Sequence, residues 1–159
     1  SMTAVKELPL YFEADGADNE NPYATGMWLV PEDDEGAGEI EALADEPLEI
    51  DAGRRYQVRV GVPLAAAQLF TPSPQGDDPD PEERREGLFA TWFLTGGQTE
   101  FRRTTYFEGE IPIEELQTNS WLVPKLSDLE GNDQVSLFVV VQDERGGVGW
   151  IGRTFDVVE

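Results

Sequence analysis

This chain of 159 residues carries 33 acidic and 11 basic residues, which gives it a formal net charge of −22. A charge of that sign excludes nucleic acid as a partner and opposes binding to anionic membrane surfaces. Because the chain has no cysteine and no histidine, disulfide bonds, thiolate metal sites and catalytic Ser–His or Cys–His pairs are excluded too. All apolar runs are shorter than the roughly 18 residues that a transmembrane helix needs, so no transmembrane segment is predicted.

Residues 1–46 are predicted to form strands and an acidic loop that pack on a larger domain. Apolar and polar residues alternate at 8–12, and residues 27–30 (MWLV) form a second apolar run. Residues 31–38 are acidic and rich in glycine, which predicts a loop. Division of the chain into two packed modules near residues 45–53 is the alternative.

Residues 47–159 are predicted to form a succession of short strands. The clearest alternation is at 54–62, where Tyr56, Val58 and Val60 share one face. Prolines and acids at 71–86 predict a long loop. Further strands are predicted at 48–51 on a sheet edge, 88–95, 101–107 and 120–123, with one helical turn at 112–116.

The C-terminal third carries the strongest β-strand pattern. Residues 135–142 are apolar on both faces near their middle, which predicts a central strand, and Gly146-Gly147 predicts a tight turn before a return strand. On that return strand Ile151 and Phe155 are expected to face the core. Arg153 shares their register, so either a bulge intervenes or its apolar stem extends to bring the charged head to a polar site.

These patterns predict an all-β fold, namely an immunoglobulin-like antiparallel β-sandwich over 47–159 with an N-terminal extension, and they predict that Trp92 is buried between the two sheets. The resemblance to known domains is carried by short motifs. Residues 49–60 (EIDAGRRYQVRV) resemble the opening strands of bacterial immunoglobulin-like and PKD-type domains, 89–93 (FATWF) resemble their Trp-bearing strand, 139–148 (VVVQDERGGV) resemble their last hairpin, and 19–23 (NENPY) resemble the Asn-x-Asn-Pro entry of predicted bacterial surface lipoproteins.

The chain lacks the two cysteines of antibody domains and the Trp-Asp-Phe-Gly-Asp-Gly stretch of PKD domains, which leaves the subfamily open. The resemblance implies an exported domain of the bacterial cell envelope or extracellular space, with lipid anchoring of the full-length protein as one option. It implies no catalytic residue.

Two acidic clusters are candidates for calcium. The preferred one comprises Asp15, Asp18 and Asn19, and the other is at residues 77–83. Calcium favours six to eight oxygen ligands from flexible loops, and both clusters offer several. Neither has the spacing of an EF-hand. The alternative is a solvated turn in a protein that is acidic throughout, so the expectation is no cofactor unless calcium binds there.

Exposed aromatic rings are the other candidate feature, with Trp28 and Trp150 as the predicted ligand-binding residues because each neighbours a glycine or a turn. An acid pair of the glycosidase kind carries little information among 33 acids. The sequence therefore predicts a monomeric, non-catalytic structural or adhesive module with a protein or surface glycan as partner. The alternative is a carbohydrate-binding module that uses exposed aromatics.

Overall fold

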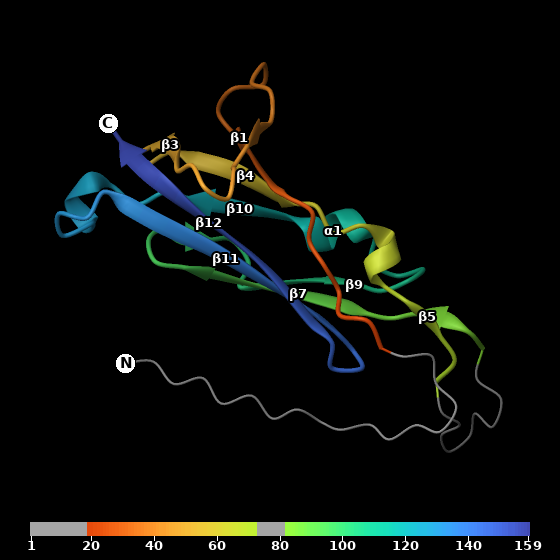
Figure 1. Cartoon of the computed structure of the whole chain (residues 1–159). Helices are drawn as coiled ribbons and strands as arrows, with labels where there is room; N and C mark the ends of the chain where they lie inside the picture. Colours follow the sequence, from red (N-terminus) through yellow and green to blue (C-terminus); the bar gives the residue numbers. More distant parts are fainter. Residues whose placement is uncertain (1–18, 73–81) are drawn as a thin grey trace.

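The computed structural model describes residues 19–72 and 82–159, which form two layers of β-sheet with a short helix at one end (Figure 1). Within these residues each layer has five strands. Sheet A has the order β2-β1-β4-β10-β8, with bounds β1 Met27–Pro31, β2 Ile40–Glu41, β4 Arg55–Val60, β8 Gln98–Thr99 and β10 Thr118–Leu122. Sheet B has the order β3-β12-β11-β7-β9, with bounds β3 Leu48–Asp51, β7 Leu88–Leu94, β9 Arg103–Tyr106, β11 Gln134–Asp143 and β12 Val148–Val158. The prediction of a mainly β protein with two packed sheets is confirmed.

Short elements complete the described part of the chain. They are the 3-10 turns η1 (Leu64–Ala66) and η2 (Leu126–Asp128), the helix α1 (Ile113–Gln117), and a small sheet of β5 (Leu69–Phe70) with β6 (Arg84–Arg85). The predicted turn at 112–116 is thus present as α1. The loop predicted at 71–86 is wrong at its end, because residues 84–85 pair with 69–70. Such short strands depend on tertiary contacts and leave little periodicity to read.

Sheet A forms because its strands alternate apolar and polar residues. Tyr56, Val58 and Val60 of β4 are buried, as the alternation predicted. β1 pairs antiparallel with β4, and Leu29 lies opposite Val58 in that register. β1 is therefore an internal strand of sheet A. The division of the chain at residues 46 and 47 stays a prediction, and the strand expected at 8–12 lies outside the described residues.

Sheet B is centred on β11, as predicted from its apolar run. Val139 lies opposite Ile151 of β12 on one side and Trp92 of β7 on the other. All three side chains are buried in the core. The indole Nε1 of Trp92 donates to Thr104 Oγ1 at 3.0 Å, and that hydroxyl donates to the carbonyl of Leu116 at 2.7 Å. The burial of Trp92 is confirmed, and its polar atom has a partner.

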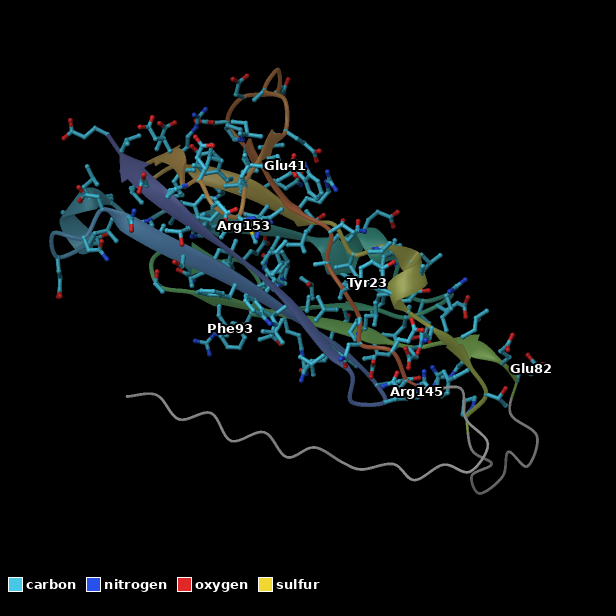
Figure 2. The ribbon with its side chains drawn as sticks, viewed as in Figure 1. Tyr23, Glu41, Glu82, Phe93, Arg145 and Arg153 are labelled. Atoms are coloured by element: carbon cyan, nitrogen blue, oxygen red, sulfur yellow. The ribbon has the colours of Figure 1, made fainter. Side chains whose placement is uncertain are left out.

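The register of the last hairpin shows whether a bulge or an extended side chain accommodates Arg153 on β12. The ladder between β11 and β12 is continuous, with Arg153 opposite Leu137, so no bulge intervenes. The side chain extends toward sheet A instead, where Nε donates to the carbonyl of Ala42 at 2.6 Å (Figure 2). Arg153 therefore links the two sheets at their β2 and β12 sides.

β3 lies at the edge of sheet B, as predicted for 48–51. It pairs with β12 in parallel, with Leu48 opposite Phe155 and Ile50 opposite Val157. The two strands enter the sheet from the same end, so the C-terminus lies beside β3 (Figure 1).

Candidate functional site

The outer face of sheet B presents three exposed aromatic side chains on three adjacent strands. Phe93 of β7 lies directly opposite Phe138 of β11. Trp150 of β12 lies opposite Val140, which is two residues from Phe138 on the same face of β11. The exposed fractions are 52% for Phe93, 40% for Phe138 and 68% for Trp150. We call Phe93, Phe138 and Trp150 the aromatic face. Phe93 is on the side of the molecule that faces away from β1 and β4 (Figure 2).

A glycine shapes the middle of the aromatic face. Gly152 of β12 lies opposite Phe138, and a Cβ atom added to it would lie 2.4 Å from Phe138 Cδ1 and 2.6 Å from Cε1. The ring of Phe138 therefore lies across the backbone of Gly152 and covers it. Only glycine leaves room for that contact. The result is a ring laid along the sheet rather than one that projects from it.

The outward residues of β7, β11 and β12 around the aromatic face are mostly uncharged. Charged side chains lie on the flanking strands, with Arg103 of β9 opposite Thr91 and the exposed Glu49 of β3 opposite Asp156. The outward residues next to the rings carry hydroxyl and amide groups, namely Thr91, Ser136, Gln142 and Thr154. Along β7, β11 and β12 the single outward acid in the described residues is Asp156, which accepts a hydrogen bond from Gln134 at 2.8 Å. In a chain of net charge −22, such a face is unusual.

The aromatic surface continues toward β9. Phe89 packs edge-on against Phe107, with ring centroids 5.5 Å apart. The guanidinium of Arg103 lies 5.0 Å from the centroid of Phe89. Both phenylalanine rings are partly buried, so they support the aromatic face from one side rather than extend it.

Trp28 and Trp150, the two predicted ligand-binding residues, lie on different sheets. Trp28 is on β1, where the guanidinium of Arg59 lies 4.3 Å from its ring centroid. A Cβ atom on Gly26 or Gly61 would lie within 3 Å of the same ring, so the indole rests on glycine backbone. Glu39 holds Arg59 with two hydrogen bonds of 2.7 and 2.6 Å, and that contact lowers the pKa of the Glu39 carboxyl. Trp28 and Trp150 therefore share no platform, and their role in ligand binding stays a prediction.

The calcium candidates fall largely outside the described residues. Asp15, Asp18 and most of the cluster at 77–83 lie there. Asn19 is described, and its amide nitrogen lies 3.3 to 3.4 Å from both carboxylate oxygens of Asp143. Within residues 19–72 and 82–159, no three acidic side chains are grouped in a way that could hold a metal ion. Calcium binding stays a prediction.

Asn19 belongs to a polar cluster at the turn between β11 and β12. Glu86, which is fully buried, is ion-paired with Arg145 and accepts a hydrogen bond from the backbone of Gln68 at 3.2 Å. Arg145 also donates to the side-chain oxygen of Gln68 at 2.9 Å. The carboxylate of Asp143 accepts from two backbone amides within the turn. We call Asn19, Gln68, Glu86, Asp143 and Arg145 the hairpin cluster.

Each charged side chain of the hairpin cluster has a partner within the fold. Burial raises the pKa of Glu86, the hydrogen bond from Arg145 lowers it, and the nearby Asp143 carboxylate raises it further. The net shift is upward. Each carboxylate accepts hydrogen bonds from inside the fold, and the cluster holds the N-terminal segment against the β11–β12 turn. Its function is therefore to hold the fold together.

The outer face of sheet A contains a hollow of about 470 Å³ lined by charged and polar side chains, among them Glu32, Arg55, Glu100 and Ser120. Arg55 and Glu32 lie 4.0 Å apart across it. Opposite charges that face one another in an open hollow are solvated and partly paired. This surface has no aromatic cluster and no buried reactive group among the residues that line it.

Phe93 and Phe138 are the candidate residues that the sequence prediction missed. The alternation at 88–95 placed Phe93 on the face opposite Trp92, so its exposure could have been inferred. Phe138 stands in an apolar run whose two faces look alike in the sequence. Phe138 is exposed because no other layer of the described residues covers this face of sheet B. The sequence alone does not reveal which face of the strand is covered.

The fold and the surface together define a mainly β protein of two five-stranded sheets with an uncharged aromatic face on one of them. A comparison with protein-family models finds no match, and a search of curated proteins finds no relative. In the described residues no helix is long and apolar enough to cross a membrane.

Proposed function

We propose that this domain is a non-catalytic interaction module of an exported bacterial envelope protein and that it binds another macromolecule through the aromatic face. The observation that carries the proposal is the exposure of Phe93, Phe138 and Trp150 at one place on the sheet. Contiguous exposed apolar surface with a polar surround is typical of interaction sites. Aromatic residues, tryptophan above all, contribute most to binding free energy at such sites.

The fold supports a binding role as well. The aromatic face lies on β7, β11 and β12, which are internal strands of a regular sheet. Side chains on paired strands are held more firmly than side chains on loops. A ligand would therefore meet rings that are already in place, which lowers the entropic cost of binding.

We propose further that the sandwich has immunoglobulin-like topology. The order β3-β12-β11-β7-β9, with a parallel edge strand and a buried tryptophan on β7, supports it. β8 departs from the usual order, because it leaves for sheet A between β7 and β9. The resemblance of residues 19–23 to surface lipoproteins supports export and the cell envelope. The net charge of −22 supports a monomer, because two such copies repel each other.

The test is binding to an array of immobilised polysaccharides and extracellular proteins. We expect wild-type protein to bind at least one probe, and the double variant Trp150→Ala with Phe93→Ala to lose most of that signal. The matched control is Phe101→Ala, because Phe101 is 53% exposed but lines a hollow on sheet A. Binding that survives the double variant, or the absence of any bound probe, would contradict the proposal.

A further inference from the structure

We infer that the ligand of the aromatic face is an uncharged polysaccharide. The inference rests on the proposed function and gives the chemical class of the partner. Three features of the face carry it: the charge of its surroundings, the polar groups between the rings, and the extent of the aromatic surface.

The net charge of the chain restricts the class of ligand. The whole chain carries −22, so a polyanion would be repelled wherever it approached. A cationic partner would be attracted to acidic surfaces, whereas along β7, β11 and β12 the single outward acid in the described residues is Asp156, at the margin of the aromatic face. A second copy of the chain would bring its own charge of −22. An uncharged ligand meets none of these penalties.

The polar groups beside the rings fit a ligand rich in hydroxyls. Thr91, Gln142 and Thr154 place hydroxyl and amide groups around Val140 and the aromatic rings. Neutral hydroxyl and amide side chains donate and accept hydrogen bonds without the desolvation cost of a charge. The C–H surface of a sugar ring packs against the π face of an aromatic side chain, while its hydroxyls reach such groups at the side.

The extent of the aromatic surface favours a chain of sugars over a single small molecule. Phe93, Phe138 and Trp150 lie on three neighbouring strands, which at about 4.8 Å per strand spacing span roughly 10 Å. Phe138 lies along the sheet over Gly152, so the middle of the surface is low and flat. An open, flat surface suits the side of an extended polymer, whereas a small ligand requires a concave pocket.

The experiment is affinity electrophoresis of the whole chain in native gels. The gels contain a neutral polysaccharide (mixed-linkage β-glucan, xyloglucan or galactomannan) or an anionic one (alginate or polygalacturonate). Pull-down on insoluble cellulose and chitin covers polymers that do not dissolve. We expect retardation or capture by at least one neutral polymer and by neither anionic one. Trp150→Ala should weaken it at least tenfold, Trp150→Phe should retain part of it, and Phe101→Ala should change nothing.

Binding should also be insensitive to NaCl, because no charge contributes to it. If no neutral polymer retards or captures the chain while an immobilised protein is bound and lost with Trp150→Ala, the inference is wrong and the proposed function stands. If a neutral polymer binds wild type and Trp150→Ala equally, both are wrong. Equal retardation by an anionic polymer would overturn the inference. Trp150 is 68% exposed, so its variants should melt like wild type, which keeps the comparison valid.

Discussion

The buried carboxylate of Glu86 is ion-paired with the guanidinium of Arg145, which stands in the turn between β11 and β12. The two residues are far apart in the sequence, and their contact joins the segment just before β7 to that turn. Arg145 is labelled in Figure 2. Arg145 also lies over the ring of Phe70, with its guanidinium carbon 5.0 Å from the ring centroid. Arg145 thereby holds the turn to two separate segments of the chain, and Asn19 of a third segment contacts Asp143.

Loss of Arg145 should destabilise the fold strongly, because it would leave the Glu86 carboxylate buried without its cation. Breaking a buried ion pair by removal of one partner costs about 3–5 kcal/mol. We expect Arg145→Ala to lose that much in the free energy of unfolding, measured by urea denaturation. The matched control is Arg55→Ala, whose exposed partner Glu32 lies 4.0 Å away and whose loss should cost less than about 1 kcal/mol. Equal effects of the two variants would show that burial of the pair does not matter.

The Glu86 carboxyl should also give the stability a pH dependence of known sign. Burial raises its pKa in the folded state above the unfolded value. At pH values between the unfolded and the folded pKa of Glu86, the folded state therefore binds more protons than the unfolded state. The contribution of Glu86 to stability falls as the pH rises through this range. Glu86→Gln does not titrate there. The melting temperature of Glu86→Gln minus that of wild type should increase as pH rises from about 4.3, the reference value for glutamate, toward neutrality. A difference that stays constant or decreases would contradict the assignment.

The hydrogen-bond chain from Trp92 through Thr104 to Leu116 should also contribute to stability. Thr104→Val keeps the shape of the side chain but leaves the indole N–H and a carbonyl without their partner. We expect a loss of about 1–3 kcal/mol for each buried group left unsatisfied. Thr105→Val is the control, because Thr105 is the next residue of β9 and faces the other side of the sheet. Trp92→Ala should cost about 3–5 kcal/mol. Unchanged denaturation of Thr104→Val would mean that water replaces the hydroxyl.

The contact between Phe138 and Gly152 should be visible by NMR. A ring that lies over a backbone shields the protons beneath it, so the α-proton resonances of Gly152 should be shifted upfield. Phe138→Ala should return them to ordinary values. Gly149 is the control within the same strand, because its neighbours are the backbone of Pro22 and Tyr23 rather than a ring. If the Gly152 resonances in wild type already match those of Phe138→Ala, the ring does not lie across the strand.

Salt should stabilise the protein. Acids exceed bases by 22 charges, so even full pairing of every base leaves a large excess of negative charge. Screening over a Debye length of about 10 Å at 0.1 M reduces that repulsion. The melting temperature should rise between 0.01 and about 0.3 M NaCl, and KCl at equal ionic strength should act alike. A melting temperature that stays level or falls would show that the acids are too far apart to repel one another.

Two kinds of pattern predicted most of the long strands. Val58 of β4 lies in an alternation of apolar and polar residues, and Val139 of β11 lies in a continuous apolar run. The strands of two residues in β2, β5, β6 and β8 could not be predicted, since two residues carry no period. The parallel pairing of β3 with β12 also escaped prediction, because the partner of an edge strand is set by the packing of the whole sandwich.

The candidate surface was harder to predict than the fold. Trp150, predicted as a ligand-binding residue, is the most exposed of the three aromatic residues, and its role in binding stays a prediction. Trp28 looked equivalent in the sequence, yet Arg59 and two glycine backbones enclose its ring. The difference depends on cross-strand neighbours. Glu86 similarly looked like one more acid of a polar loop until the fold brought Arg145 beside it.

The hairpin cluster has a mechanical consequence. Asn19 is bonded at the turn that precedes β12, whereas the chain ends beside β3 at the far end of the same strand (Figure 1). β12 has 11 residues, which at about 3.3 Å per residue is on the order of 35 Å. Tension applied at residues 19 and 159 would therefore act along the strands, and it would load the hydrogen bonds of β12 to β11 and β3 together in shear rather than one after another. In that geometry several hydrogen bonds must break together before β12 separates from its neighbours.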